Sequence, residues 1–143
     1  MSDEMFAALK PGLTASTEIM VGTRDTAPHV GCGKVKVLAT PVMVSLMEEA
    51  ALNAVEGLLP PGYQTVGTHL DVTHTAATPV GMRVSAHAEL VAIEGRRLRF
   101  RVTANDEADP IGEGVHDRII VELARFDART ARKAAQVSSS RKA

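Results

Sequence analysis

The sequence is poor in several residue types, and each shortage excludes a class of protein. Its 143 residues include one cysteine, Cys32, which excludes an internal disulfide and a cysteine-rich zinc site and makes a reducing cytoplasm the expected compartment. Aromatic residues make up 3%, which argues against a platform on which nucleic-acid bases stack. The formal net charge of −1 gives no reason to expect a nucleic acid or an anionic membrane as a partner.

Long apolar runs are also missing. No stretch approaches the roughly 20 residues that a membrane-spanning helix needs. The N-terminal Met1-Ser2-Asp3-Glu4 lacks the basic region and the apolar run of a signal peptide. A chain of 143 residues therefore fits one soluble domain with a single core.

One long helix is predicted over residues 40–59. Thr40 is expected to cap the free amides of its first turn, Pro41 suits the first helical position, and Pro60-Pro61-Gly62 ends it. Glu48 lies on the shoulder of the apolar side of this helix. At 100° per residue, that side comprises Met43, Met47, Ala50, Ala51, Ala54 and Leu58.

Alternating apolar and polar residues predict antiparallel strands before and after this helix. Glu94-Gly95 is a candidate hairpin turn, and Gly112 and Gly114 indicate a bulge or a close backbone approach. The expected strands cover Thr14–Gly22, Tyr63–His74, 82–92, 97–104 and Ile111–Phe126, and His29–Gly33 is expected to be a loop. The apolar faces of the two central strands comprise Met82, Val84, Ala86, Ala88, Leu90 and Ala92, and Leu98, Phe100, Val102 and Ala104.

A long apolar helix followed by long antiparallel strands predicts an α+β fold in which a curved sheet wraps the helix. Such a sheet leaves open edges, so two chains are expected to pair into a dimer with a continuous sheet. Residues 1–126 are expected to form this single domain. Residues 127–143 are expected to be a tail, a frayed helix followed by disorder, because they are rich in Ala, Arg, Lys and Ser.

Glu48 is the first candidate catalytic residue because it is a carboxylate beside an apolar stripe. Burying such a charge costs several kcal/mol unless it is paired, although a glutamate at a helix rim can also extend into solvent. His74 ends a strand between Thr73 and Thr75, and its alternative role is that of an ordinary surface histidine. With Thr40, these residues bring a carboxylate, an imidazole and a hydroxyl within reach of one another, as in a hydrolase.

Other motifs are absent or ambiguous. There is no Gly-x-Ser-x-Gly elbow, no phosphate-binding loop ending in Lys-Ser or Lys-Thr, and no His-Glu-x-x-His. His69, Asp71 and His74 imitate metal ligands, but a strand turns the first two to one face and the third to the other, so no metal site is expected. The basic stripe of arginines at 96, 97, 99 and 101 is either a solvated face paired with acidic residues or an anchor for phosphates.

Four segments resemble the fluoroacetyl-CoA thioesterase family of hotdog-fold thioesterases: Val42–Glu48, Val72–Pro79, Glu94–Leu98 and Ile111–Arg118. The resemblance implies a long helix wrapped by an antiparallel sheet, and dimers with active sites at the subunit interface. It implies catalytic roles for Thr40, Glu48 and His74. It also implies that the Gly67 amide lies near the thioester carbonyl and that Arg118 belongs to the site.

The resemblance implies an acyl-CoA substrate and no separate cofactor, since CoA is part of the substrate. The phenylalanines that favour the fluorinated acyl group in this family are absent from residues 31–39, so a broader short acyl-CoA thioesterase is expected. Two alternatives remain open. One is a non-catalytic acyl-CoA-binding protein, and the other is a hotdog-fold enoyl-CoA hydratase that uses Asp71 with His74.

Overall fold

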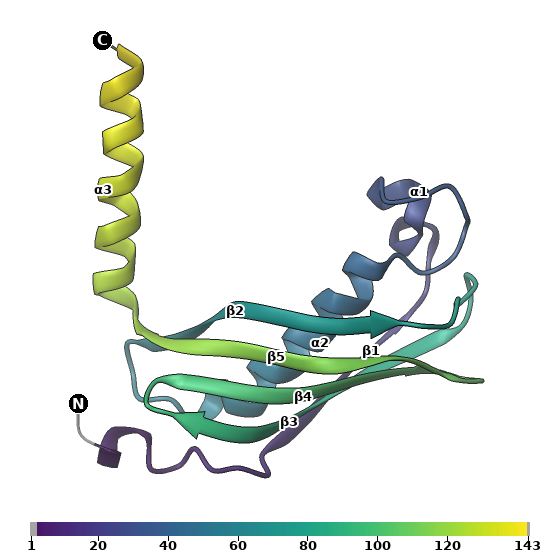
Figure 1. Cartoon of the computed structure of the whole chain (residues 1–143), viewed down its shortest axis with the longest axis horizontal. Helices are drawn as coiled ribbons and strands as arrows, with labels where there is room; N and C mark the ends of the chain where they lie inside the picture. Colours follow the sequence, from purple (N-terminus) through teal and green to yellow (C-terminus); the bar gives the residue numbers. More distant parts are fainter. Residues whose placement is uncertain (1–2, 143) are drawn as a thin grey trace.

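The computed structural model describes residues 3–142 and shows an antiparallel five-stranded sheet packed against one long helix (Figure 1). The helix is α2 (Thr40–Val55). The strands are β1 (Thr14–Met20), β2 (Tyr63–His74), β3 (Arg83–Glu94), β4 (Arg97–Asp106) and β5 (Pro110–Glu122), in the order β1-β3-β4-β5-β2. The predicted α+β hotdog layout is confirmed. Met1, Ser2 and Ala143, from the expected N-terminal segment and tail, lie outside the described residues.

The core lies between α2 and the inner face of the sheet. Phe100 is fully buried at its centre, and burying an aromatic or aliphatic side chain of this kind contributes about 1.5–3 kcal/mol. The predicted alternation of β4 is confirmed, with all four apolar residues buried. The helix contributes Met43, Leu46, Met47, Ala50, Ala51, Ala54 and Val55.

Both ends of the predicted helix need correction. Ala39, not Thr40, occupies the N-cap, since its carbonyl accepts the amides of Val42 and Met43. The α-helix ends at Val55 and continues as the 3₁₀ helix η3 (Glu56–Leu58). Leu58 is consequently 39% exposed rather than part of the core, because a 3₁₀ turn rotates side chains away from the 100° spacing of an α-helix.

Two strand predictions are also wrong in detail. Leu90 pairs with Phe100 and Ala92 with Arg99, so Val91 is an extra residue in β3. The alternation ends at this bulge, and residues 91–94 are all exposed, Ala92 among them. Strand β5 ends at Glu122 rather than at residue 126, and a helix begins directly after it.

The glycines of β5 do allow a close backbone approach, as predicted. A Cβ on Gly112 would lie 2.5 Å from the Thr73 carbonyl oxygen, and one on Gly114 would overlap the Asp71 carbonyl oxygen. Strands β2 and β5 can therefore pack tightly along their shared ladder.

Short helices precede α2: η1 (Asp3–Phe6), η2 (Thr23–Asp25) and α1 (Ala27–Val30). The first residues of the loop expected at 29–33 thus belong to α1, which ends at Gly31 with a left-handed φ of 89°. This segment lies at the N-terminal end of α2 (Figure 1).

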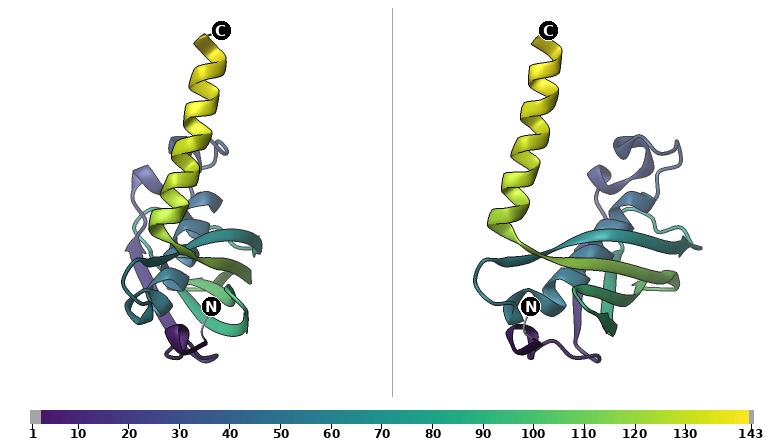
Figure 2. Two further views of the ribbon diagram at one scale, coloured as in Figure 1. Left: turned by 90° about the vertical axis from the view of Figure 1, so that its left-hand side faces the viewer. Right: turned by 60° about the vertical axis from the view of Figure 1, so that its left-hand side comes forward.

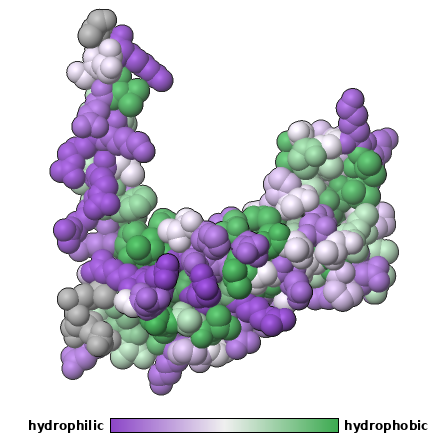
Figure 3. Space-filling view, in the orientation of Figure 1, coloured by the Kyte–Doolittle hydropathy of each residue, from purple (hydrophilic) through white to green (hydrophobic). Residues whose placement is uncertain are grey.

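The C-terminal helix α3 (Leu123–Lys142) projects away from the sheet (Figures 1 and 2). Its 20 residues extend about 30 Å at 1.5 Å per residue. Hydrophilic residues cover most of its visible surface (Figure 3). None of the helices in residues 3–142 is long and apolar enough to cross a membrane.

Candidate active site

The first polar cluster, the Thr40 cluster, consists of Thr40 and His74. Thr40 Oγ1 lies 2.7 Å from His74 Nδ1. The Thr40 hydroxyl does not cap the helix and is instead hydrogen-bonded to the imidazole. Thr40 opens α2, and His74 ends β2 opposite Gly112 of β5. A cavity of about 310 Å³ opens beside the pair, lined by Ala27, Cys32, Val37, Leu38, Thr75, Ala76 and Ala77.

His74 is prepared to accept a proton. Burial lowers its pKa from the usual value of 6.5, and the nearby backbone of Ala76 opposes this shift. Its Nε2 atom is buried and has no hydrogen-bond partner among the described residues. The imidazole is therefore neutral at pH 7 and has one ring nitrogen not used by the fold.

The second cluster, the Glu48 cluster, consists of Glu48, Gly67, His116 and Arg118. Arg118 Nη1 lies 3.6 Å from Glu48 Oε2, and the two side chains are 8% and 38% exposed. Two hydrogen bonds to Thr65 hold the Arg118 side chain in place. Its Nε donates to Thr65 Oγ1 at 2.9 Å, and its Nη2 donates to the Thr65 carbonyl oxygen at 3.0 Å. Burial lowers the pKa of Arg118, and nearby Glu48 raises it.

Gly67 provides the space for the carboxylate. A Cβ at this position would lie 2.9 Å from Glu48 Oε2 and 3.1 Å from His116 Cε1. Gly67 pairs with Arg118, and the next paired residues are His69 and Asp117, so Thr68 is a bulged residue in β2. The carboxylate of Glu48 can thus approach the β2 backbone beside an irregularity of the strand.

His116 is a member of the cluster that the sequence analysis missed. It is fully buried, and its Nδ1 lies 2.8 Å from the His69 carbonyl oxygen. Its Nε2 lies 3.2 Å from Arg118 Nη1. Since the guanidinium can only donate, Nε2 accepts and the proton is on Nδ1. Burial lowers the pKa of His116, and nearby Arg118 lowers it further.

A sequence signal for His116 existed. Period-two spacing places Gly112, Gly114, His116 and Arg118 on one face of β5. A histidine on the same face as a candidate site arginine, two residues away, has a reason to be in the site. Its residue type alone gave no such reason.

The structure brings Thr40 to His74, and it brings Glu48 to Gly67 and Arg118, as two separate groups. Thr40 and Glu48 are eight residues apart on α2, a rise of about 12 Å along the helix. No hydrogen bond joins Glu48 to His74 within residues 3–142. A catalytic set that unites all three residues stays a prediction.

Within the described residues, neither a metal site nor a phosphate anchor on the basic stripe gains support. No group of three His, Cys, Asp or Glu side chains within residues 3–142 is arranged to hold a metal ion. The three arginines of the basic stripe that lie in β4 are paired with acidic residues, which favours the solvated face over the phosphate anchor. Arg97 pairs with Glu94 at 3.0 Å, Arg99 with Asp117 at 2.8 Å, and Arg101 with Glu113 at 3.8 Å.

Known thioesterases are similar to this chain. The fluoroacetyl-CoA thioesterase of Streptantibioticus cattleyicolor is 48% identical over 68% of this chain and 70% of its own length. A mutant of the fluoroacetyl-CoA enzyme FlK in complex with acetyl-CoA is 38% identical, covers 87% of this chain and 98% of its own, and superposes with a TM-score of 0.82. A thioesterase superfamily member from Thermus thermophilus is 30% identical, covers 91% and 96%, and has a TM-score of 0.85.

The family model for the fluoroacetyl-CoA-specific thioesterase matches residues 21–124. This range contains both polar clusters and four of the five strands, β2 to β5, while β1 lies entirely before it. It ends at the base of α3, so nearly all of that helix lies beyond the match. The chain belongs to the fluoroacetyl-CoA-specific thioesterase family of hotdog-fold proteins.

Proposed function

We propose that this chain hydrolyses short acyl-CoA thioesters to a carboxylic acid and free CoA. The observation that carries the proposal is the neutral His74 imidazole, hydrogen-bonded to Thr40 and with a buried, unused Nε2. A group of this kind beside a cavity suits proton transfer. The substrate brings its own CoA, so no separate cofactor is proposed, and the expected compartment is the reducing cytoplasm.

The reaction requires a proton acceptor, a proton donor and a place for the oxyanion. Water adds to the carbonyl carbon, the C–S bond breaks, and the departing thiolate takes a proton. His74 serves as the base toward water and then as the acid toward the thiolate. The Gly67 amide stabilises the oxyanion, a contribution of roughly 3 kcal/mol when such a donor is well placed.

Glu48 acts by one of two routes. It attacks the carbonyl carbon directly and forms a transient anhydride, or it orients the attacking water for His74. In either route, Arg118 pairs with the carboxylate and fixes its direction. Incorporation of ¹⁸O from labelled water into the Glu48 side chain during turnover supports the anhydride route, because only attack of water on the Glu48 carbonyl of the anhydride places the label there.

A dimer unites the two clusters. The outer edge of β2 has no partner strand within residues 3–142, and Leu70 on it is 37% exposed. Antiparallel pairing of two β2 strands about an axis at Asp71, with Thr68 bulged, sets Gly67 opposite His74 of the partner subunit. The Glu48 cluster of one chain and the Thr40 cluster of the other then form one site.

The acyl group is small and need not carry fluorine. The cavity beside His74 is lined by aliphatic and small side chains, Cys32 among them. Residues 31–39, which precede α2, contain no aromatic residue. We therefore expect turnover of several short acyl-CoAs, with little preference for fluoroacetyl-CoA over acetyl-CoA.

A panel of acyl-CoAs assayed for thiol release tests the proposal. The parent chain should release CoA, and Glu48→Gln and His74→Ala should each slow release by a factor of 100 or more. Parent-like rates in both variants would refute the assignment. CoA-ester binding without thiol release indicates the binding protein, and loss of enoyl-CoA absorbance without thiol release indicates the hydratase.

Mixed dimers test the shared site. A dimer of one Glu48→Gln chain and one His74→Ala chain retains one intact site if the clusters combine across the interface, hence about half the parent rate. If each chain holds a complete site, the mixed dimer has none and is as slow as either variant alone.

A further inference from the structure

The C-terminal helix α3 has little contact with the rest of its own chain. Its base is joined to the sheet, where the Leu123 amide donates to the Gly62 carbonyl oxygen at 2.9 Å. Beyond the base, residues 127–141 are all exposed. A helix that is polar on most sides gains little from packing, and alone in water a helix of this length is marginally stable. A partner outside its own chain would supply the missing contacts.

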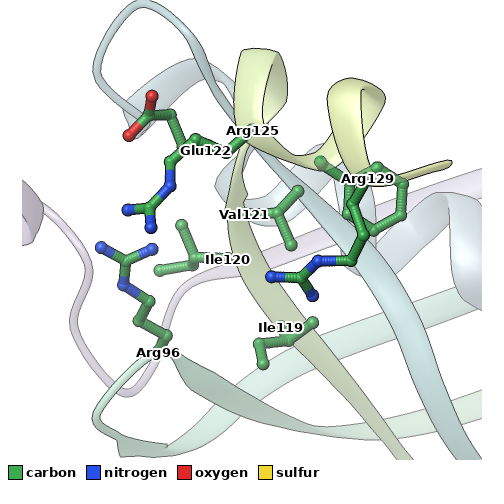
Figure 4. Close-up of a pocket in the computed structure, with 8 residues that line it drawn as sticks. Arg96, Ile119, Ile120, Val121, Glu122, Arg125 and Arg129 are labelled. Atoms are coloured by element: carbon green, nitrogen blue, oxygen red, sulfur yellow. The ribbon is translucent and has the colours of Figure 1, made fainter. Parts of the chain in front are cut away.

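One side of α3 is basic and faces the sheet. At the base, Arg125 and Arg129 extend over β5 and line a cavity of about 270 Å³ together with Glu122 (Figure 4). Arg132 and Lys133 follow Arg129 by three and four positions, so they continue the same side of the helix away from the base.

Away from the base, this basic side has no acidic neighbour in the helix. No acidic residue lies three or four positions from Arg132 or Lys133. Within residues 3–142, neither of these side chains is part of an ion pair. Of the 20 residues of α3, six are basic and one is acidic. A surface that covers this side should therefore carry negative charge.

The turn between β4 and β5, residues 106–109, carries three carboxylates and is called the acidic turn below. Asp106 Oδ1 accepts two backbone amides of the turn at 2.8 and 2.7 Å, so the turn is held in one conformation. Glu107 Oε1 accepts the Arg83 amide at 2.7 Å, while the Arg83 guanidinium is paired elsewhere. Glu107 and Asp109 are exposed. The acidic turn thus has the charge that the basic side of α3 requires.

The proposed dimer brings the acidic turn of one subunit to α3 of the other. Glu122 at the end of β5 pairs with Tyr63, whereas Gly112 near its start pairs with His74. Two antiparallel β2 strands therefore set the α3 end of one chain beside the acidic-turn end of its partner. With Gly67 opposite His74 of the partner subunit, α3 starts about 13 Å beyond that end, and the partner's acidic turn lies about 10 Å beyond it, at about 3.3 Å per residue.

The direction and length of α3 suit this contact. Figures 1 and 2 show α3 extending past β2, on the side away from β4 and β3, where the sheet of a partner subunit would continue. The partner's acidic turn lies between three and four strand spacings from β5, about 17 Å at about 4.8 Å each. An α-helix rises 17 Å in about 11 residues, which brings the segment around Lys133 to the turn.

We propose, on the basis of the dimer in the proposed function, that α3 is an arm that docks on the acidic turn of the partner subunit through Arg132 and Lys133. Each chain extends one arm and receives one, so the contact occurs twice in the dimer. Nearly all of α3 lies beyond the family match at residues 21–124, so the arm is an addition to the family domain.

The docked turn is connected to the candidate active site. Asp106 Oδ2 accepts a hydrogen bond from Thr78 Oγ1 at 2.8 Å. The residues just before Thr78, residues 75–77, line the cavity beside His74. The arm therefore holds together the two chains that share a site, and it contacts a turn that is bonded to the wall of that site.

A charge swap tests the proposal without any substrate. Arg132→Glu/Lys133→Glu should raise the dissociation constant of the dimer about tenfold or more, measured by sedimentation at low ionic strength, where charges are least screened. Ala108→Lys/Asp109→Lys should raise it similarly, and it leaves the hydrogen bonds of the other two carboxylates in place. All four substitutions in one chain should return the constant to within about threefold of the parent value.

A control variant uses the opposite side of the same helix. Ala131→Glu/Ser138→Glu adds two carboxylates there and should keep the parent dissociation constant. Circular dichroism verifies that every variant retains α3.

Three results would overturn the proposal: an unchanged constant in Arg132→Glu/Lys133→Glu, an equal change in the control, or no recovery in the fourfold variant. A parent chain that stays monomeric at every concentration tested overturns it as well. If the charge swap succeeds but the parent releases no thiol from acyl-CoA, the arm is supported and the proposed hydrolysis is refuted.

Discussion

The two polar clusters differ in how firmly the fold holds them. In the Glu48 cluster, Arg118 is buried and bonded to Thr65 twice and to His116 once. In the Thr40 cluster, one hydrogen bond joins an exposed hydroxyl to His74, whose other ring nitrogen has no partner within residues 3–142. One cluster is a packed network, and the other is a single contact at the rim of a cavity.

This difference separates structural from chemical roles. Substitutions in the Glu48 cluster leave buried polar atoms unpaired, so they should reduce both stability and activity. Substitutions in the Thr40 cluster disturb little packing, so they should reduce activity at nearly constant stability. Four predictions test this distinction, beginning with the largest expected effect.

Arg118→Met should have the largest effect on stability. The change leaves His116 Nε2 and the Thr65 oxygens without their donor inside the core. We expect a loss of about 3 kcal/mol in the free energy of unfolding, measured by urea denaturation.

The matched control is Arg83→Met in the Arg83–Glu18 pair, whose side chains are 55% and 51% exposed. An exposed pair of this kind contributes at most about 1 kcal/mol. Equal losses in the two variants would show that the Arg118 network is no firmer than a surface ion pair.

Gly67→Ala should have the second largest effect. The new methyl group would lie 2.9 Å from Glu48 Oε2 and 3.1 Å from His116 Cε1, so the carboxylate must move. We expect about 1–3 kcal/mol of destabilisation from overpacking, together with loss of thiol release. Gly57→Ala serves as control, because its Cβ would meet nothing within 4 Å. Full activity in Gly67→Ala would show that the observed Glu48 position is not required.

The sequence was sufficient to predict the layers of the fold, because they depend on periodicity. The strict alternation of Leu98, Phe100 and Val102 could produce only a strand with one buried face, and the structure has one. The errors arose where the period changes. The bulge at Val91 and the 3₁₀ turn after Val55 shift the phase of the pattern, and neither has a local signal as clear as alternation.

The sequence predicts which residues form the candidate site, but not which of those residues lie next to one another. Glu48 is a candidate because it is a carboxylate beside apolar residues, and in the structure its partner is the buried Arg118. The position of Gly67 opposite Arg118 depends on the register of β2 against β5, which residue spacing does not specify. Residue type alone does not distinguish a buried histidine such as His116 from a surface one, so the signal lies only in its place two residues before Arg118 on the same face of β5.

The dependence of stability on pH should also distinguish the clusters. Burial lowers the pKa of both His74 and His116 below the unfolded value of 6.5. The unfolded chain therefore binds more protons between the folded pKa values and pH 6.5, so stability is fully present above pH 6.5 and is lost as the pH falls below it.

Denaturation curves measured from pH 7.5 down to pH 5 provide the check. His116→Gln should remove more of this pH dependence than His74→Gln, because His116 is fully buried and His74 is partly exposed. The same slope in both variants and the parent would show that neither histidine is held neutral by the fold.

Thr40→Val should have the smallest effect on stability and a clear effect on catalysis. A threonine that caps a helix contributes about 1 kcal/mol, but here Ala39 occupies the cap and the Thr40 hydroxyl contacts His74. We expect a change of less than about 0.5 kcal/mol in the free energy of unfolding, as for an ordinary surface substitution. The kcat for acetyl-CoA should fall about tenfold, the value of one hydrogen bond, and Thr40→Ser should restore most of it. A loss of 1 kcal/mol or more in stability at parent kcat would instead make Thr40 a structural residue of the helix start, and the hydroxyl would have no part in positioning the imidazole.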